Sequence, residues 1–273
     1  MLVTVDTGGT KTLVASFSED GTLGTQIKFA TPKKSSDYVD LLRETLLENY
    51  KGQTVEAIVI GLPGTITDGV AVWCQNLKWR NFDVRAALKG VLGDAPILVE
   101  NDANLAGLAE AHALKSIPPL ALYVTVSTGI GSGIITNGII DPSLSHSEAG
   151  RSLVEYDGVI REWEDFASGK AIYEAFGKYA RDITSKRTWY QVADRISRGF
   201  LTLIPTLQPE VIIIGGSIGT YFDNYSEKLV GLLKEHLPSH IPMPKFVQAV
   251  HPEQAVIYGC YYYALQILAD TAA

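Results

Sequence analysis

The chain of 273 residues is 46% hydrophobic and 19% charged, which is typical of a globular protein and excludes a largely disordered one. Its 30 acidic and 23 basic side chains give a net charge of −7, which argues against nucleic acid as a partner, because phosphate backbones require a dense basic surface. Two cysteines, Cys74 and Cys260, are too few for a disulfide scaffold and favour a reducing, cytoplasmic compartment.

The N-terminal part of the chain predicts a β-hairpin followed by a helix. Residues 2–5 form a short apolar run, a Gly-rich turn covers residues 6–10, and a second apolar run covers residues 12–17. The first run lacks the basic and long apolar regions of a signal peptide, so we expect no secretion. Ser35-Ser36-Asp37 then predict a helix N-cap, because apolar side chains follow it at helical spacing.

The middle of the chain alternates predicted strands and helices, which places it in the α/β class. Residues 55–62 and 96–99 are predicted strands, and the alanine-rich residues 103–114 are a predicted helix. Residues 116–140 carry no charged side chain and are long enough to span a membrane, but they contain two prolines, four glycines and many hydroxyl groups. We therefore predict two buried strands joined by a polar turn, and no membrane partner.

The strand and glycine turn of the N-terminus recur in the second half of the chain. A strand at residues 122–126 leads into the glycine-rich residues 127–133, and Thr128-Gly129 can be laid over Thr7-Gly8. The separation of the two turns is the length of one compact domain, so we infer two similar halves, each opening with a strand, a turn and a strand.

The last third of the chain predicts a helix, a buried strand and a second helix. The first helix covers residues 189–207 and bends near its end at Pro205, and the strand, residues 211–214, runs into a Gly-Gly-Ser turn. Residues 253–268 are apolar and unbroken, which predicts a long packed helix. We expect a small N-terminal domain, a C-terminal helix packing near it and a large C-terminal domain, with bounds at 1–117, 253–273 and 118–252.

Both glycine turns carry the residue types that bind phosphate. Glycine lets backbone N–H groups approach phosphate oxygens, while Thr, Ser and Lys side chains add hydrogen-bond donors and charge. The first turn also contains Asp6, which is placed to hold a metal ion through water, and neither turn has the spacing of a Walker A or dinucleotide-binding motif. Asp102 follows a predicted strand, where its carboxylate either takes the proton of an attacking hydroxyl or caps the next helix.

Four motifs occur in the order and spacing of the ROK family, and the sequence resembles that family over essentially the whole chain. They are DTGGTKT at residues 6–12, ENDAN at 100–104, STGIGSGI at 127–134 and IIIGGSIG at 212–219. The family comprises bacterial sugar kinases and sugar-responsive repressors. The resemblance implies a two-domain actin/hexokinase-like (ribonuclease H-like) α/β fold with a cleft between the domains. Since the first motif begins at Asp6, we expect a kinase and not a repressor with an N-terminal DNA-binding domain.

The resemblance implies a homodimeric hexose kinase that phosphorylates a glucose-like sugar at its 6-hydroxyl with ATP and magnesium (Mg2+). Asp102 would be the catalytic base, and Asp6 would orient the complex of magnesium and phosphate. Phosphate contacts would come from Gly8, Gly9, Thr10, Lys11, Thr128 and Gly129. The adenosine would lie against Gly215, Gly216 and Ser217. Sugar contacts would come from Asn76, Asn101, Asp102, Glu148, Arg151 and Glu164.

Two departures from the family pattern concern zinc and the sugar. The family's zinc site uses a histidine and three closely spaced cysteines, but Arg151 stands at the histidine position and no cysteine lies between Cys74 and Cys260. The resemblance therefore implies a protein without structural zinc, in which His146 is a surface side chain. The missing histidine also contacts the sugar in the family, so the sugar preference stays open.

Two alternatives to an ATP-dependent kinase remain. The chain also resembles polyphosphate glucokinases, which are similarly short and lack the zinc cysteines, so the donor is ATP or inorganic polyphosphate. A non-catalytic sugar or nucleotide sensor would keep the same fold, but a sensor needs no catalytic base, so the presence of Asp6 and Asp102 favours an enzyme.

Overall fold

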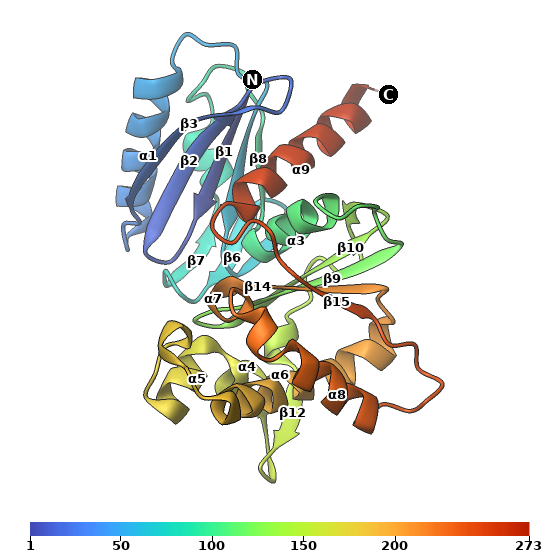
Figure 1. Cartoon of the computed structure of the whole chain (residues 1–273). Coiled ribbons are helices and arrows are strands. Elements are labelled where there is room, and N and C mark those ends of the chain that lie inside the picture. The colour runs from blue at the N-terminus through green and yellow to red at the C-terminus, as the bar shows by residue number, and fades with distance from the viewer. Residues whose placement is uncertain (273) are drawn as a thin grey trace. The chain divides into compact units, whose positions relative to one another are not determined.

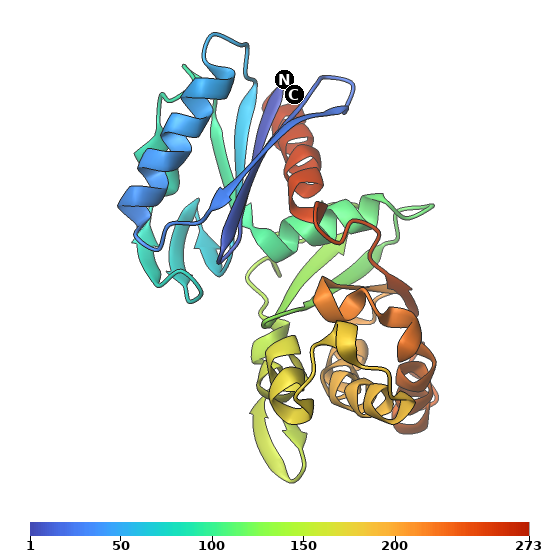
Figure 2. The same ribbon diagram turned by 60° about the vertical axis from the view of Figure 1, so that its left-hand side comes forward.

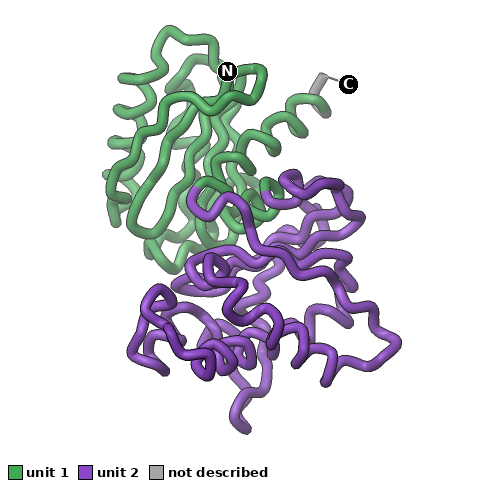
Figure 3. The backbone as a smooth tube through the Cα atoms, viewed as in Figure 1, with its two compact units in different colours: residues 1–109, 254–273 green, residues 110–253 purple. Residues whose placement is uncertain are grey.

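The computed structural model describes residues 1–272, with side chains through residue 269, and the chain forms two compact units (Figures 1 and 3). Unit 1 comprises residues 1–109 and the C-terminal segment from Gln254, and unit 2 comprises residues 110–253. Each unit is built on its own five-stranded sheet. Among the described residues, no helix is sufficiently long and apolar to cross a membrane.

Unit 1 contains a mixed sheet in the order β3-β2-β1-β4-β8. Its strands are β1 (Leu2–Thr7), β2 (Lys11–Phe17), β3 (Leu23–Ala30), β4 (Ala57–Leu62) and β8 (Ile97–Asn101). The first three pair antiparallel, which confirms the predicted N-terminal hairpin, whereas β4 and β8 run parallel to β1. Every residue of β4 is buried, and its sequence is continuously apolar because a parallel strand covered on both faces has no solvent side.

Helices cover both faces of this sheet (Figure 2). α1 (Ser35–Tyr50) packs Leu42 and Leu46 into one core with Val3 and Ile58, and α9 (Ala255–Ala272) lies against β1 and β4 on the other face. α9 also approaches α3 (Asp102–His112) closely, since a Cβ added at Gly259 would meet backbone atoms of α3. The helices predicted over residues 103–114 and 253–268 are therefore present.

The start of α1 differs from the predicted cap at Ser35-Ser36-Asp37. Lys34 is the N-cap residue, with an extended backbone and no side-chain cap hydrogen bond, so the predicted cap is wrong. The Ser36 hydroxyl instead donates to the Asp37 carboxylate (3.0 Å) inside the first turn. Asp37 still favours this end of the helix, because negative charge is stabilised near a helix N-terminus.

Between β4 and β8 the chain forms a small antiparallel sheet in unit 1. β5 (Thr65–Thr67), β6 (Val70–Cys74) and β7 (Trp79–Phe82) pair in this order, and α2 (Val84–Leu88) follows. The turn between β6 and β7 contains Asn76, so this sheet positions a residue that the sequence assigns to the sugar.

Unit 2 repeats the topology of unit 1, with the strand order β11-β10-β9-β14-β15. Its strands are β9 (Leu120–Val126), β10 (Ile130–Thr136), β11 (Ile139–Ile140), β14 (Val211–Gly215) and β15 (Lys245–Gln248). The first three pair antiparallel, and β14 and β15 run parallel to β9, as in unit 1. The predicted repeat is confirmed, and the uncharged stretch at residues 116–140 contains the predicted pair of strands, β9 and β10.

A hairpin and several helices complete unit 2. These elements are η1 (Ala149–Arg151), β12 (Leu153–Tyr156), β13 (Val159–Glu162), α4 (Glu164–Ala167), α5 (Gly169–Phe176), η2 (Ala180–Asp182), α6 (Lys186–Leu207), α7 (Gly216–Gly219), η3 (Phe222–Asn224) and α8 (Ser226–His236). α6 continues two residues past Pro205 to Leu207, and the C-cap residue Gln208 stops the helix with a φ of 47°. The buried rings of Trp163 and Phe200 pack edge to face, with centroids 5.2 Å apart.

Candidate functional site

The turn between β1 and β2 is held in shape by the segment that follows β3. The Gly8 N–H donates to the Lys11 oxygen (2.9 Å), and the Thr31 hydroxyl donates to the Gly8 oxygen (2.8 Å). The Lys33 ammonium donates to the Gly9 oxygen (2.7 Å), so carbonyl oxygens of the turn are bound from outside while the Lys11 side chain stays exposed. Of the predicted phosphate residues of unit 1, the structure places Gly8, Gly9 and Thr10 in this turn and Lys11 at the first position of β2.

Asp6 and Asp102 lie at the same edge of the unit 1 sheet. β1 pairs with β4 as far as Asp6 and Gly61, and β4 pairs with β8 as far as Leu62 and Asn101, so the carboxyl ends of three parallel strands meet. The pKa of Asp6 is raised to about 7, chiefly because burial disfavours the carboxylate and secondarily because Asp102 is negatively charged. The predicted metal-orienting residue and the predicted base are thus electrostatic neighbours.

Asn101 makes the hydrogen bonds of a helix cap, directly before Asp102. Its side-chain oxygen accepts the N–H groups of Ala103 (2.8 Å) and Asn104 (3.0 Å), and its side-chain nitrogen donates to the Gly64 oxygen (2.8 Å). Asp102 is the first residue of α3, and its carboxylate accepts the Ala103 N–H (2.8 Å). The carboxylate therefore sits where the helix dipole favours negative charge, while both ends of the Asn101 amide are already bonded within the chain.

Two further features of unit 1 surround Asp102. Gly64 has a φ of +94°, and an added Cβ would lie 2.1 Å from the Trp73 oxygen, so only glycine fits at the point that holds Asn101. The pKa of the buried Cys74 thiol is raised to about 11, mainly by burial and also by the charge of Asp102, so Cys74 stays a neutral neighbour of the carboxylate. Neither residue was assigned to the site from the sequence, because an isolated glycine and an isolated cysteine carry no motif.

Asn76, in the turn after Cys74, packs against the first phosphate turn. An added Cβ at Gly9 would lie 3.4 Å from the Asn76 Cβ, which is the distance of ordinary van der Waals contact. We call Asp6, Asn76, Asn101, Asp102 and residues 8–11 the unit 1 cluster.

In unit 2, the second phosphate turn lies directly against Glu164. The Ile130 N–H donates to Glu164 Oε2 (3.1 Å), and an added Cβ at Gly129 would lie 2.7 Å from the same oxygen. The turn between β9 and β10 is closed by the Ser127 N–H, which donates to the Gly129 oxygen (2.9 Å). The structure thus brings together a predicted phosphate turn, with Thr128 and Gly129, and a predicted sugar carboxylate.

The predicted adenosine turn meets the same region of unit 2. Gly216 has a φ of +79°, and an added Cβ would lie 2.5 Å from the Val126 oxygen at the end of β9. The Gly169 N–H donates to the Ser127 oxygen (2.6 Å), and an added Cβ at Gly169 would lie 3.5 Å from the Ser217 hydroxyl. Residues 215–217 and the start of α5 therefore pack against the second phosphate turn, and glycine is required where the backbones touch.

Arg151 bridges two carboxylates of unit 2. Its Nη1 lies 2.5 Å from Glu162 Oε2 and 2.9 Å from Glu164 Oε1. The pKa of Arg151 is raised, chiefly by the hydrogen bond to Glu162 and also by the charges of Glu164, Glu162 and Glu148. The pKa of Glu148 is raised as well, first by partial burial of its carboxyl group and then by Glu164, while Arg151 opposes the rise.

We call Thr128, Gly129, Glu148, Arg151, Glu164 and residues 215–217 the unit 2 cluster. Arg151 thus pairs with Glu164, a predicted sugar contact, and with Glu162, which the sequence did not assign to the site. His146, expected at the surface, is exposed. No three His, Cys, Asp or Glu side chains among the described residues are grouped so that they could hold a metal ion.

Comparison with known proteins identifies this arrangement, since the model of the ROK family matches residues 2–267. The chain belongs to the ROK family. An N-acetylmannosamine kinase of Yersinia pestis (strain Pestoides F) is 30% identical over 275 residues, covering 92% of this chain and 93% of that protein. A polyphosphate glucokinase of Mycobacterium tuberculosis (strain CDC 1551 / Oshkosh) is 27% identical over 245 residues, covering 86% of this chain and 82% of that protein. The protein is a sugar kinase of the ROK family.

Solved structures agree on the fold. The crystal structure of a ROK family glucokinase from Streptomyces griseus, in complex with glucose and AMPPNP, matches with a TM-score of 0.81. The match covers 97% of this chain and 99% of that chain at 22% sequence identity. The actin/hexokinase-like α/β fold implied by the sequence motifs is therefore confirmed.

Proposed function

We propose that this ROK sugar kinase transfers the terminal phosphoryl group of ATP to the 6-hydroxyl of a glucose-like hexose, with Asp102 as the general base. The observation that carries the proposal is the position of Asp102, which is the first residue of α3 at the sheet edge that also presents Asp6. A helix N-terminus favours negative charge, and a carboxylate placed there can accept the proton of an attacking hydroxyl.

In this mechanism Asp102 accepts the proton of the sugar hydroxyl as its oxygen attacks the terminal phosphorus of the donor. The bond between that phosphorus and the bridging oxygen breaks, and the nucleoside diphosphate leaves with the electron pair. Cys74 remains a neutral thiol next to Asp102, because its pKa is raised to about 11. Asn101 fixes the first turn of α3 through its cap and therefore orients the base.

The glycine turns bind the donor phosphates in this proposal. Backbone N–H groups of the two turns and the Lys11 ammonium oppose the negative charge that phosphoryl transfer spreads over the phosphate oxygens. Asp6 suits a magnesium site, because a nearby cation would stabilise the ionised form of a buried carboxyl group that is close to the charge of Asp102. Asp6 would hold magnesium through water, and the bound ion would supply further neutralisation of the phosphates.

The sugar is assigned to the polar side chains of both clusters. Glu148 and Glu164 would accept sugar hydroxyl groups, and Asn76 would contribute an amide. Because the Asn101 amide is bonded to Gly64 and to α3, we assign it mainly to holding Asp102 rather than to the sugar. The glucose and AMPPNP bound to the Streptomyces griseus glucokinase support glucose and ATP as the ligands of this protein. We also expect a cytoplasmic homodimer without structural zinc.

Inorganic polyphosphate as a second donor is supported by the similarity to a polyphosphate glucokinase. The packing of residues 215–217 against the second phosphate turn favours ATP, because polyphosphate has no adenosine to place there. A coupled assay with magnesium tests both donors against glucose, mannose, fructose, N-acetylglucosamine and N-acetylmannosamine. We expect the highest kcat/KM with ATP and glucose, and absence of phosphorylation of every sugar with either donor would refute the proposed function.

A further inference from the structure

We propose that Glu162 is a positioning residue for sugar binding, which holds Arg151 in the orientation that joins Arg151 to Glu164. Glu162 belongs to no recognised motif of this chain. The effect on sugar binding rests on the proposed function, whereas the ion pairs of Arg151 with Glu162 and Glu164 are present in unit 2 whatever the function.

One nitrogen atom of Arg151 serves both carboxylates. Nη1 lies 2.5 Å from Glu162 and 2.9 Å from Glu164. A movement of the guanidinium away from Glu162 therefore also changes its contact with Glu164. The side chain of Arg151 is 41% exposed and that of Glu164 is 22% exposed. An exposed pair between Arg151 and Glu164 alone would be weakly ordered, and a second carboxylate restricts the long arginine side chain.

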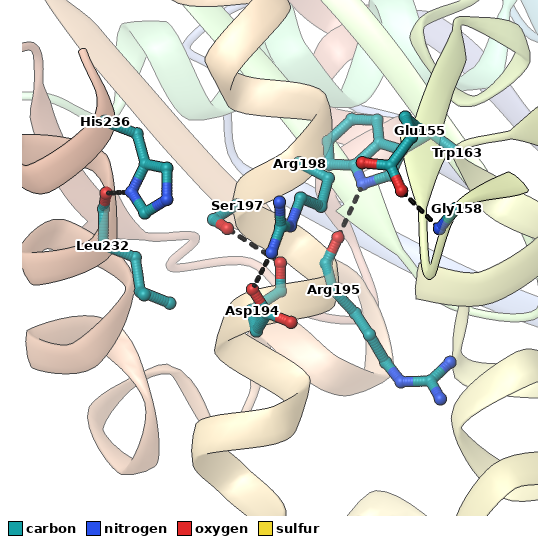
Figure 4. Close-up of polar contacts among 9 residues, drawn as sticks. All are labelled: Glu155, Gly158, Trp163, Asp194, Arg195, Ser197, Arg198, Leu232 and His236. Carbon is teal, nitrogen blue, oxygen red and sulfur yellow. Dashed lines mark hydrogen bonds and ion pairs between the residues drawn. The ribbon is translucent and has the colours of Figure 1, made fainter. Parts of the chain in front are cut away.

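The backbone that carries Glu162 is rigidly anchored. Trp163 follows Glu162, is fully buried, and donates its backbone N–H to the oxygen of Ser152, the residue after Arg151 (2.9 Å). The Trp163 indole N–H donates to the Arg195 oxygen on α6 (3.2 Å), as Figure 4 shows. Backbone hydrogen bonding therefore joins the segments that carry Arg151 and Glu162, and this fixes the orientation of the ion pair.

Glu164 is held between Arg151 and the second phosphate turn. Its Oε1 contacts Arg151, while its Oε2 accepts the Ile130 N–H (3.1 Å), so the carboxylate is held from two directions. A sugar hydroxyl that bonds to Glu164 meets a carboxylate whose position and charge depend on Arg151. Loss of Glu162 should therefore weaken sugar binding while leaving proton transfer at Asp102 intact.

The experiment compares Glu162→Gln with a matched change on the same hairpin, Glu155→Gln. Glu155 accepts the Gly158 N–H (2.5 Å) in the hairpin turn, so its variant removes a carboxylate of β12 without touching Arg151 (Figure 4). We expect Glu162→Gln to raise the sugar KM about threefold to thirtyfold. The rise should be smaller than the loss of a buried hydrogen bond to a charged group would cause, because the Arg151 side chain is 41% exposed. The kcat and the donor KM should stay within about twofold of wild type, and Glu155→Gln should change nothing.

Two further readouts separate positioning from a general loss of structure. Because Glu162 acts through Arg151, Glu162→Gln should add no further rise in KM to Arg151→Ala, whereas Glu162→Asp should restore part of the affinity. The positive charge of Arg151 lowers the pKa of Glu148, whereas the negative charge of Glu164 raises it. If Arg151 moves away, the pKa of Glu148 should therefore rise further. The acid limb of kcat/KM for the sugar should then move to higher pH in Glu162→Gln and not in Glu155→Gln.

Unchanged sugar KM and an unchanged acid limb in Glu162→Gln would overturn the inference. Failure of the proposed function looks different, because wild-type protein would then phosphorylate no sugar. In that case crystal structures of the wild type and of Glu162→Gln decide the inference directly. Arg151 should leave Glu164 in the variant, and an Arg151 that keeps this contact would refute the positioning role.

Discussion

At the scale of single residues, the two carboxyl groups of the unit 1 cluster are placed in contrasting environments. Asp6 lies near the end of β1, and burial together with the charge of Asp102 raises its pKa to about 7. Asp102 instead begins α3, where the backbone dipole favours an ionised carboxylate. Neighbouring acids whose environments differ in this way can take different roles, one with a cation and one with a proton.

Asp102→Asn removes the proposed base while nearly preserving the shape of the side chain. We expect kcat to fall by a factor of about 10² to 10⁴, the usual contribution of a general base, with sugar binding and melting temperature retained. Asp83→Asn is the matched control, because Asp83 accepts the Ala86 N–H (2.9 Å) at the start of α2 and is assigned no catalytic role. Near-wild-type turnover of Asp102→Asn would show that Asp102 is not the base.

Asp6→Asn tests the raised pKa through the pH dependence of stability. A carboxyl whose pKa rises from 3.8 to about 7 on folding binds its proton more tightly in the folded state, so stability falls as pH increases through that window. Asparagine cannot ionise, so the variant should gain up to about 4 kcal/mol of unfolding free energy relative to wild type on going from pH 4 to pH 8. Thermal melts without nucleotide or magnesium measure this, and a difference independent of pH would contradict it.

The motif residues could be predicted from the sequence because their chemistry is local to a short string. Residues 8–10 form the predicted turn before β2, and Asp102 directly follows a strand, as the sequence predicted, while their roles remain proposals. Cys74 and Glu162 could not be predicted in this way, since each becomes relevant only through a partner that is distant in sequence or lies on another element: Asp102 for the thiol and Arg151 for the carboxylate.

At the scale of elements, periodicity identified the long helices and buried strands but missed short elements. The hairpin of β12 and β13 escaped because Leu153 and Ile160 are 70% and 71% exposed, so apolar side chains do not mark its buried face. The small sheet of β5, β6 and β7 escaped for the same reason, since Trp73 is 41% exposed. Short strands that present apolar residues to solvent lack the alternation on which such predictions depend.

Gly199 makes a specific prediction about the packing of α6. An added Cβ would lie 2.1 Å from the ring of the fully buried Trp163, so Gly199→Ala must displace that indole or the helix. We expect a loss of about 1–3 kcal/mol in unfolding free energy from this overpacking. Gly231→Ala on α8 is the control, because nothing lies within 4 Å of its added Cβ, and alanine should stabilise that helix by about 0.5–1 kcal/mol. Urea unfolding measures both, and equal effects would contradict the packing argument.

At the scale of the whole molecule, the chain builds one sheet order twice. Local sequence suggested the repeat through its glycine turns, but it did not give the order of the five strands, because that order depends on pairings between distant segments. The segment that returns from unit 2 is fixed inside that unit by Glu110, which is 1% exposed. Its carboxylate accepts the N–H groups of Val250 and His251, both at 2.7 Å. Beyond this point the chain completes unit 1 with α9.

The return of α9 to unit 1 should couple a distant position to catalysis. A Cβ added at Gly259 would lie 1.9 Å from the Leu105 oxygen and 2.3 Å from its carbonyl carbon, which are backbone atoms of α3 and cannot rotate away. Gly259→Ala must therefore separate α9 from α3, the helix whose first residue is Asp102.

We expect Gly259→Ala to lower both the melting temperature and kcat, because a shift of about 1 Å at a reacting group can cost on the order of 10²-fold in rate. Leu265→Ala is the control, since this residue of α9 is 44% exposed and its truncation should change stability by less than about 0.5 kcal/mol. Thermal melts and steady-state kinetics on both variants provide the measurement. A Gly259→Ala protein with lowered stability but unchanged kcat would show that the position of α3 tolerates the displaced helix, and that α9 contributes to unit 1 only as part of its core.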